Sequence, residues 1–304
     1  MPSVTAGRLC PKGIFVAPRM SQYRHESERI MEILARTGAV IEKMSIDEAY
    51  LDVSGILPGA TSDDELIPPS IKLAREIKET ILRERQLTAT IGIASNKLIA
   101  KLASDFNKPD GLTLVPERDK VLFLRPMSVR AIHGVGKVTE QILNHAGIRT
   151  VGDLQDYSGD LRKIIGSFGP TLKQYSMGED RRALETDTET KSISSEETFR
   201  SDTSDKRRMR DCLRDQAAEI SAELKETNLG AHTVQVKIRY SDFTTLTRQI
   251  SLEEPMTEAE EIFRLGCFLL AREKLADRPV RLLGLGVSGL GESIVRQLRL
   301  NLSA

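Results

Sequence analysis

Two adjacent carboxylates, Asp47 and Glu48, are the residues of this chain best suited to chemistry. They stand in I-E-K-M-S-I-D-E-A-Y-L-D-V-S-G at 41–55, a stretch whose apolar residues are typical of a largely buried strand. Burying an acid costs free energy unless a cation or a hydrogen bond compensates. Because Mg²⁺ prefers carboxylate oxygens and keeps positions open for water and phosphates, the pair predicts a magnesium site.

The geometry of a regular strand does not by itself bring these acids together. Neighbouring side chains on a strand point to opposite faces of the sheet. Both acids serve one metal site only if the backbone bends there, and Ser45 offers a turn. The other interpretation is a strand end whose two acids are solvated.

The rest of the sequence favours the metal site. Five segments, in this order, resemble the Y-family, the translesion DNA polymerases, and specifically the DNA polymerase IV branch. The resemblance covers nearly the whole chain, and five ordered matches are more specific than any one of them. The segments are S-I-D-E-A-Y-L-D at 45–52, T-I-G-I-A-S-N-K-L-I-A-K-L-A-S-D at 90–105, N-K-P-D-G at 107–111, I-H-G-V-G-K-V-T at 132–139 and R-L-L-G-L-G-V-S at 281–288.

The resemblance implies template-directed DNA synthesis by two-metal nucleotidyl transfer from a dNTP to a primer 3′-hydroxyl. Asp47 would bridge two Mg²⁺ ions, and Glu48 would support the ion that activates the hydroxyl. Lys108 would contact the incoming triphosphate, because phosphoryl transfer depends on positioning and charge neutralisation. From the residues alone, Lys108 also fits an ordinary turn lysine, and Lys97 and Lys101 fit a solvated helix face.

The implied fold is α+β, a multidomain right-hand polymerase. Its first residues resemble a segment inside the fingers, so the first palm strand and its carboxylate are expected to be missing, which puts the activity of this exact chain in question. The expected parts are a remnant of the fingers at 1–18, a palm at 19–111, a thumb with a helix-hairpin-helix at 112–177, a linker at 178–192, a β-α-β-β-α-β little finger domain at 193–294 and a tail at 295–304.

Local patterns within the expected palm predict its elements. Apolar residues at helical spacing favour helices over 21–37 and 71–82, the latter with Leu82 on its inner face. The Gly-, Pro- and Ser-rich stretch 57–69 is typical of a loop. A β-branched strand at 88–94 precedes a helix for which Ser95 is the expected N-cap.

Phosphate contacts are expected from a sequence that resembles a helix-hairpin-helix. Gly134 and Gly136 allow the backbone to approach a phosphate closely, and Lys137 adds a charge at the start of a helix. A looser copy at 166–176 adds Lys173. Contacts of this kind hold DNA without reading its sequence.

The last third of the chain predicts a four-stranded sheet with two helices on one face. The other face is polar, so Lys237 and Arg239 are candidates for DNA phosphates, although an ordinary solvated face has the same pattern. The expected strands are 193–199, 232–240, 243–252 and 280–288, and the expected helices are 206–227 and 258–275.

The tail resembles the short peptide with which bacterial polymerases of this group bind the sliding clamp. A terminal edge strand would show the same alternation of leucines and polar residues. The residues that would bind the clamp are Gln297, Leu298, Leu300 and Leu302.

Composition limits the partners. The chain has 44 basic and 44 acidic residues, so its net charge is zero and any DNA affinity must come from local patches. Three isolated cysteines fit neither a disulfide framework nor a zinc site. No apolar run has membrane-spanning length and the start M-P-S-V-T-A-G is not a secretory signal, so we expect a cytoplasmic protein without a membrane partner. We also expect a monomer.

Three functions remain open at this point. The first is a DNA-directed DNA polymerase whose partners are primer-template DNA, dNTP and the sliding clamp. The second is a non-catalytic DNA- or clamp-binding protein derived from such a polymerase. The third is another nucleotidyl-transfer enzyme that shares only the palm, such as a cyclase, which the helix-hairpin-helix and the last domain argue against.

Overall fold

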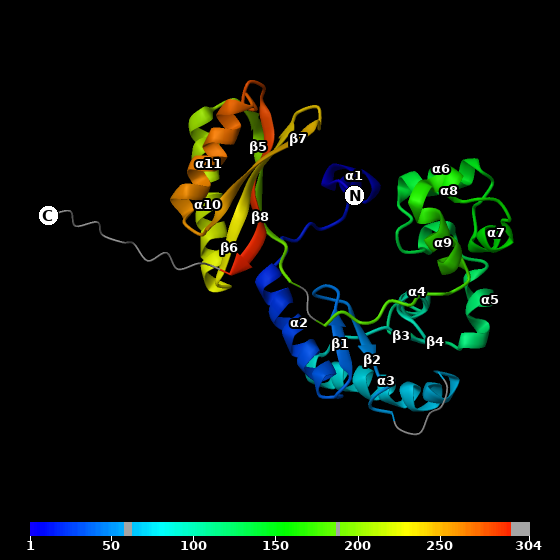
Figure 1. Ribbon diagram of the computed structural model, residues 1–304. Helices are drawn as coiled ribbons and strands as arrows, with labels where there is room; N and C mark the ends of the chain where they lie inside the picture. Colours follow the sequence, from blue (N-terminus) through cyan, green and yellow to red (C-terminus); the bar gives the residue numbers. More distant parts are fainter. Residues whose placement is uncertain (58–62, 187–188, 293–304) are drawn as a thin grey trace. The chain divides into compact units, whose positions relative to one another are not determined.

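The computed structural model describes residues 1–57, 63–186 and 189–292, with the side chains of 63–66 left aside (Figure 1). The chain forms two compact units, Met1–Asp187 and Thr188–Ala304. None of the described helices combines the length and apolarity needed to cross a membrane.

The first part of unit 1 packs two helices against a hairpin. Helix α1 (Ser3–Leu9) buries no residue, whereas α2 (Met20–Ala35) packs against α3 (Asp63–Arg85) and the antiparallel pair of β1 (Val40–Lys43) and β2 (Ala49–Asp52). Their shared core consists of Met31, Ile33, Leu34, Ile77 and Ile81.

Two local expectations for α3 are wrong. Residues 63–69 belong to the helix instead of a loop, even though Pro68 and Pro69 lie within it. Proline inside a helix removes one hydrogen bond and crowds the preceding turn, which is why the composition indicated a loop that the chain does not form here. Leu82 is 52% exposed and does not face the core, which α3 reaches instead through Ala74, Ile77 and Ile81.

A β-α-β unit follows in the chain. Strand β3 (Ile91–Ala94) pairs in parallel with β4 (Leu112–Val115), and α4 (Lys97–Phe106) connects them. The N-cap of α4 is Asn96, whose side chain accepts a hydrogen bond from the N–H of Ile99; the expectation of Ser95 was one residue early. Asn96 is extended, as an N-cap residue should be.

Short helices fill the rest of unit 1. The apolar face of α4, with Leu98 and Leu102, belongs to the same buried cluster as Leu124, Leu143 and Leu172 from these helices. One continuous core therefore joins α4 to the helical part. The helices are α5 (Lys120–Leu124), α6 (Lys137–His145), α7 (Val151–Asp156), α8 (Arg162–Ile165) and α9 (Gly169–Ser176), with 3₁₀ turns η1 (Glu117–Asp119), η2 (Val129–Ala131) and η3 (Gly166–Phe168).

Unit 2 is a four-stranded antiparallel sheet in the order β5-β8-β6-β7, with two helices on one face (Figure 1). The strand–helix–strand–strand–helix–strand order along the chain is the expected one. The elements are β5 (Ser192–Thr203), α10 (Lys206–Glu226), β6 (Leu229–Tyr240), β7 (Thr245–Met256), α11 (Ala259–Arg272) and β8 (Val280–Glu292).

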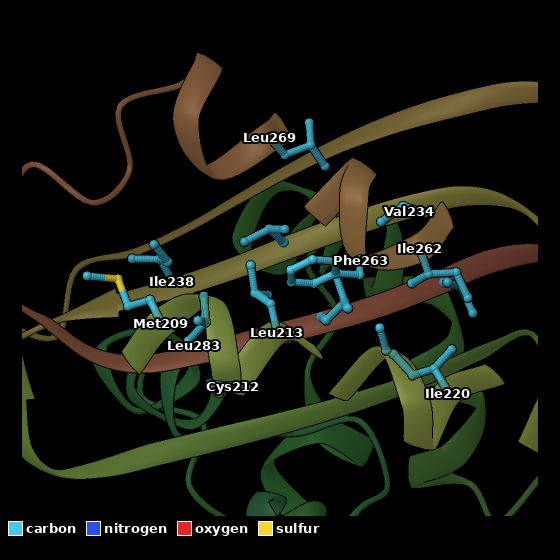
Figure 2. Packing of buried hydrophobic residues seen from close by; sticks show 14 of the residues in the cluster. Met209, Cys212, Leu213, Ile220, Val234, Ile238, Ile262, Phe263, Leu269 and Leu283 are labelled. Carbon is cyan, nitrogen blue, oxygen red and sulfur yellow. The ribbon is translucent and has the colours of Figure 1, made fainter. Parts of the chain in front are cut away.

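The core of unit 2 lies between the helices and the sheet. Figure 2 shows Leu213 and Ile220 of α10 and Phe263 of α11 beside β6, which carries Val234 and Ile238. The alternation predicted for β6 is confirmed, because Val234 and Ile238 are fully buried while their neighbours along the strand are partly exposed. The opposite face of the sheet is polar.

Candidate active site

The two carboxylates lie in the bend of the β1–β2 hairpin and not inside a buried strand. The N–H groups of Met44 and Ser45 both donate to the carbonyl of Glu48, at 3.0 and 3.2 Å, which closes the bend. The Ser45 hydroxyl donates to the Asp47 carboxylate. Both acids are exposed, so the expectation that they are buried is wrong. The free-energy cost of burying a carboxylate therefore gives no reason to expect a metal ion here. The bend does remove the constraint of a regular strand, on which the two side chains would point to opposite faces.

One cavity of unit 1 collects the charged groups that the sequence singles out. Its volume is about 1390 Å³, and its lining includes Asp47 and Glu48 from the bend, Lys101 from α4 and Lys108 from the turn that follows α4. The cavity therefore presents both acids and both lysines to the same space. This shared lining is the main structural support for a reactive site.

Three ion pairs connect these groups. The Lys101 ammonium contacts a Glu48 oxygen directly and lies 3.7 Å from a carboxylate oxygen of Asp105. The other Asp105 oxygen is 2.6 Å from the ammonium of Lys108. Partial burial alone would lower the pKa of Lys101, but the hydrogen bond to Glu48 and the charge of Asp105 raise it above its ordinary value. Lys101 is therefore a stable cation at the acids.

The turn that carries Lys108 is held in place by a lysine from α3. The ammonium of Lys78 donates to the carbonyls of Ala89 and Asp110, at 2.5 and 2.9 Å, and also contacts the Asp110 carboxylate. These bonds tie the turn to α3 and to the residues before β3. The position of Lys108 is thus set by the surrounding backbone, while its own side chain stays half exposed.

One turn before Lys101, Lys97 has a different environment. Its ammonium lies 2.5 and 2.7 Å from the two oxygens of Glu42 on β1, and the two side chains are only 8% and 7% exposed. The ring of Tyr50 lies 5.0 Å below the ammonium. The interpretation of Lys97 as part of a solvated helix face is therefore wrong. Burial would raise the pKa of Glu42, but the hydrogen bonds from Lys97 and from the Glu185 N–H hold that pKa below its ordinary value.

Residues 178–185 are bound to α4 and β1, although the sequence predicts a linker over 178–192. The Asn96 amide donates to the carbonyl of Gly178 at 2.9 Å, and the N–H of Glu185 donates to Glu42 at 3.0 Å. Between them, the Asp180 carboxylate accepts the N–H of Leu98 at 3.1 Å and the guanidinium of Arg182. We call residues 178–185 the strap, and its residues 180–184 line the same cavity as the two acids.

Asp180 is the anchor of the strap. Its side chain is 1% exposed, so its charge depends on the donors around it. Burial would raise the pKa of Asp180, but the hydrogen bonds from the side chain and backbone of Arg182 lower it below the ordinary value. A carboxylate that receives an N–H from the first turn of α4 is also stabilised by the helix dipole.

The oxygen donors of this site are of the kind that a hard divalent cation prefers. Asp47 and Glu48 offer carboxylate oxygens beside one cavity, which is what Mg²⁺ prefers. Within residues 1–57, 63–186 and 189–292, no three His, Cys, Asp or Glu side chains are grouped closely enough to form a metal site on their own. The two carboxylates would thus supply part of a coordination shell.

The predicted helix-hairpin-helix places two glycines just before the start of α6. Gly134 has φ of +89°, a value that glycine adopts without strain, and Gly136 precedes the first turn of α6. As a glycine, the N-cap residue Gly136 has no side chain with which to cap α6. Lys137 is exposed, and no ion pair holds it among the described side chains. The ring of Phe168 packs against Gly134, where a Cβ would come within 2.7 Å.

The other predicted DNA contacts are arranged differently. The ammonium of Lys173 donates to the carbonyls of Leu154, Gln155 and Tyr157, so it holds the C-terminal end of α7. On the polar face of the sheet, Lys237 pairs with Glu196 at 2.7 Å and Arg239 donates to Thr245. The candidate clamp residues Gln297, Leu298, Leu300 and Leu302 lie outside the described residues.

Sequence reasoning missed Glu42, Asp105 and Asp180 as parts of the site. Asp105 carries a local signal, because it follows Lys101 by four residues and precedes Lys108 by three. Glu42 carries none, since Lys97 lies 55 residues away, and the local pair of Asp180 with Arg182 gives no sign that Asp180 also binds Leu98, 82 residues away. Periodicity within a segment cannot reveal pairs of that kind.

Comparison with known proteins gives consistent matches over both units. Residues 1–105 match the family described as impB/mucB/samB family, and residues 190–300 match the impB/mucB/samB family C-terminal domain. A DNA polymerase IV of Halorhodospira halophila is 39% identical over 95% of this chain and 80% of its own length. A DNA polymerase IV of Clostridium perfringens is 37% identical over 100% of this chain and 83% of its own length.

Solved structures give the same result. A Y-family polymerase chimera of Dbh and Dpo4 superposes with a TM-score of 0.82 at 28% identity, over 96% of this chain and 83% of the chimera. An insertion ternary complex of Dbh DNA polymerase matches with a TM-score of 0.64 at 27% identity, over 96% of this chain and 83% of that chain. The fold is accordingly of mixed α and β content, as expected.

Proposed function

This chain belongs to the Y-family of DNA polymerases, and we propose that its cavity in unit 1 is the site where a dNTP is joined to a primer 3′-hydroxyl. The observation that carries the proposal is the common lining of that cavity by Asp47, Glu48 and Lys108. The relatives match nearly the whole chain, which favours an enzyme of translesion type over a non-catalytic DNA- or clamp-binding protein.

Each of the three side chains has a separate task in this proposal. Polymerases of this family use divalent metal ions, and we assign two Mg²⁺ ions to Asp47 and Glu48. Bound there, the ions would polarise the phosphate and stabilise the attacking and leaving oxygens. Lys108 binds the triphosphate, because its ammonium is half exposed to the cavity and its turn is anchored by Lys78. Positioning and charge neutralisation are the main requirements of phosphoryl transfer.

We assign the parts of the chain to a right-hand polymerase. The proposal retains the fingers remnant at 1–18, the palm at 19–111, the helix-hairpin-helix thumb at 112–177 and the little finger domain at 193–294. The strap at 178–185 is added to the palm, because its hydrogen bonds go to α4 and β1. The tether between the units is then shorter than the linker predicted from sequence.

Duplex DNA is the proposed macromolecular partner. The start of α6, with Gly134 and Gly136 before it, would supply N–H groups for a phosphate, and Lys137 would add a charge that no ion pair holds among the described residues. On the sheet of unit 2, Lys237 and Arg239 would add contacts without sequence preference. Lys173 would act through the geometry of α7 and α9, since its donors are used within the unit. We also propose that the protein is a monomer and that its tail binds a sliding clamp.

Primer extension tests the assignment of the acids. Asp47→Asn and Glu48→Gln remove one charge each while keeping the side-chain size, and each should lower the rate of extension about 100-fold or more, comparable to the loss of a major electrostatic contribution. Lys108→Met should weaken dNTP binding more than it lowers the maximal rate. Lys72→Met, at an exposed pair on α3, is the matched control and should extend as the unmodified chain does. Unchanged extension in both acid variants would refute the assignment.

A further inference from the structure

Lys101 occupies a particular position among the acids of the cavity. It is in direct contact with Glu48 and has a second carboxylate, Asp105, only 3.7 Å from its ammonium. Asp105 in turn holds Lys108 at 2.6 Å. The four charges form a chain of alternating sign that runs from the bend of the hairpin, across α4, to the turn after it.

A divalent ion and the Lys101 ammonium require the same carboxylate. Two cations at one carboxylate repel each other, and at a partly exposed site the repulsion is a substantial fraction of the binding free energy. Any ion that binds Glu48 must therefore displace the lysine or accept weaker binding. Asp105 provides a place for the displaced lysine, since a small rotation of a flexible four-carbon stem reaches it.

We propose that Lys101 is a built-in counter-ion of Glu48, which a divalent cation displaces onto Asp105. Asp105, already 3.7 Å from the Lys101 ammonium, then becomes the main partner of that lysine, so its hold on Lys108 weakens. Binding of the cation at Glu48 thereby releases Lys108 for an anionic ligand such as a triphosphate. This inference rests on the proposed role of Glu48 as a metal ligand.

The exposure of the participants favours such an exchange. The side chain of Lys101 is 37% exposed, and those of Glu48 and Asp105 are 44% and 49% exposed. Ion pairs with this much access to water are weak and re-form at little cost. Lys101 therefore acts as a positioning residue for the charges around it and does not need to contact the reacting atoms.

The test measures binding of Mn²⁺ to the full chain by electron paramagnetic resonance, without DNA or nucleotide. Lys101→Met removes the competing cation and should tighten Mn²⁺ binding about 2- to 5-fold, the range expected for one partly exposed ion pair. Lys101→Arg keeps the charge and should restore the binding of the unmodified chain. Lys72→Met, which breaks a pair remote from the acids, should leave Mn²⁺ binding unchanged.

Asp105→Asn should change Mn²⁺ binding in the opposite direction. Without the second acceptor the displaced lysine has no partner, so Mn²⁺ binding should weaken about 2- to 5-fold. In the double variant with Lys101→Met the Asp105 substitution should have much less effect, because the two residues act as one unit. Unchanged or weaker binding in Lys101→Met, or full additivity of the two changes, would overturn the proposal.

Glu48→Gln separates this proposal from the proposed function. If Glu48→Gln abolishes Mn²⁺ binding and Lys101→Met does not tighten it, the counter-ion proposal fails while Glu48 stays a ligand. If Glu48→Gln leaves Mn²⁺ binding unchanged, the assignment of the metal site fails, and the counter-ion proposal fails with it.

Discussion

Lys97 and Lys101 lie one turn apart on α4, and each pairs with a glutamate of the β1–β2 hairpin, yet the two pairs differ in exposure. Lys97 and Glu42 are 8% and 7% exposed, whereas Lys101 and Glu48 are 37% and 44% exposed. A buried pair cannot lose one partner without leaving an uncompensated charge, while an exposed pair exchanges partners with water and ions. The hairpin is thus fixed at Glu42 and adjustable at Glu48.

The strap reinforces the fixed pair. Glu185 donates its N–H to Glu42, and Asp180 binds the first turn of α4 through Leu98. Lys97 is the first residue of that same helix. The buried charges, the helix start and the strap therefore form one network, which holds α4 against β1, while Lys101, one turn further along α4, lines the cavity.

Breaking the buried pair should have the largest effect on stability. Lys97→Met leaves Glu42 without its cation and should lower the free energy of unfolding of unit 1 by about 3–5 kcal/mol, measured by urea denaturation. Replacing both partners, as Lys97→Met with Glu42→Leu, should recover most of the loss because no buried charge remains. A loss from Lys97→Met no larger than that from Lys101→Met would contradict the comparison.

Removing the anchor of the strap should have the next largest effect. Asp180→Ala leaves the N–H of Leu98 without its acceptor and frees Arg182, and should lower the free energy of unfolding by about 1–3 kcal/mol. Hydrogen exchange gives a local measurement, since the Leu98 amide should lose protection while amides of β5 keep theirs. Equal protection of Leu98 in both proteins would show that the strap does not hold α4.

The difference between the two lysines also explains where sequence reasoning succeeds. Side-chain alternation along β6 and helical spacing along α10 reflect burial within one element, so unit 2 could be predicted closely from its sequence. The strand 243–252 was placed slightly early, because Phe243 adopts a φ of +64° in the turn before β7. Such a turn depends on backbone geometry that residue type does not specify.

The site was only partly predictable. Asp47, Glu48 and Lys108 were identified through short motifs, and the structure brings all three to one cavity. The burial of Lys97 depends on Glu42, which is 55 residues away, and nothing in the local pattern of α4 distinguishes it from Lys101. Tertiary contacts decide which lysine is a structural cation and which lies at the cavity.

Lowering the pH should reduce the stability that the Lys97–Glu42 pair contributes and so bring it closer to that of the Lys101–Glu48 pair. The pKa of Glu42 is held below its ordinary value of 4.5, so Glu42 contributes stability above that pH and loses its contribution as the pH falls through the folded value. The difference in unfolding free energy between the unmodified chain and Lys97→Met should therefore be largest near pH 7 and shrink below pH 4.5. Urea denaturation at a series of pH values measures it, and a difference that stays constant with pH would contradict the role of Glu42.

Breaking the exposed pair should have the smallest effect on stability. Lys101→Met removes a partner that water readily replaces at Glu48, so the free energy of unfolding should change by no more than about 1 kcal/mol. Asp105 keeps Lys108 as its partner in this variant, so no carboxylate of the chain of ion pairs is left buried and unpaired. Urea denaturation of Lys101→Met beside Lys97→Met measures the contrast directly. A loss from Lys101→Met as large as that from Lys97→Met would mean that Lys101 also holds the hairpin in place, and a lysine with that task could not yield Glu48 to a metal ion.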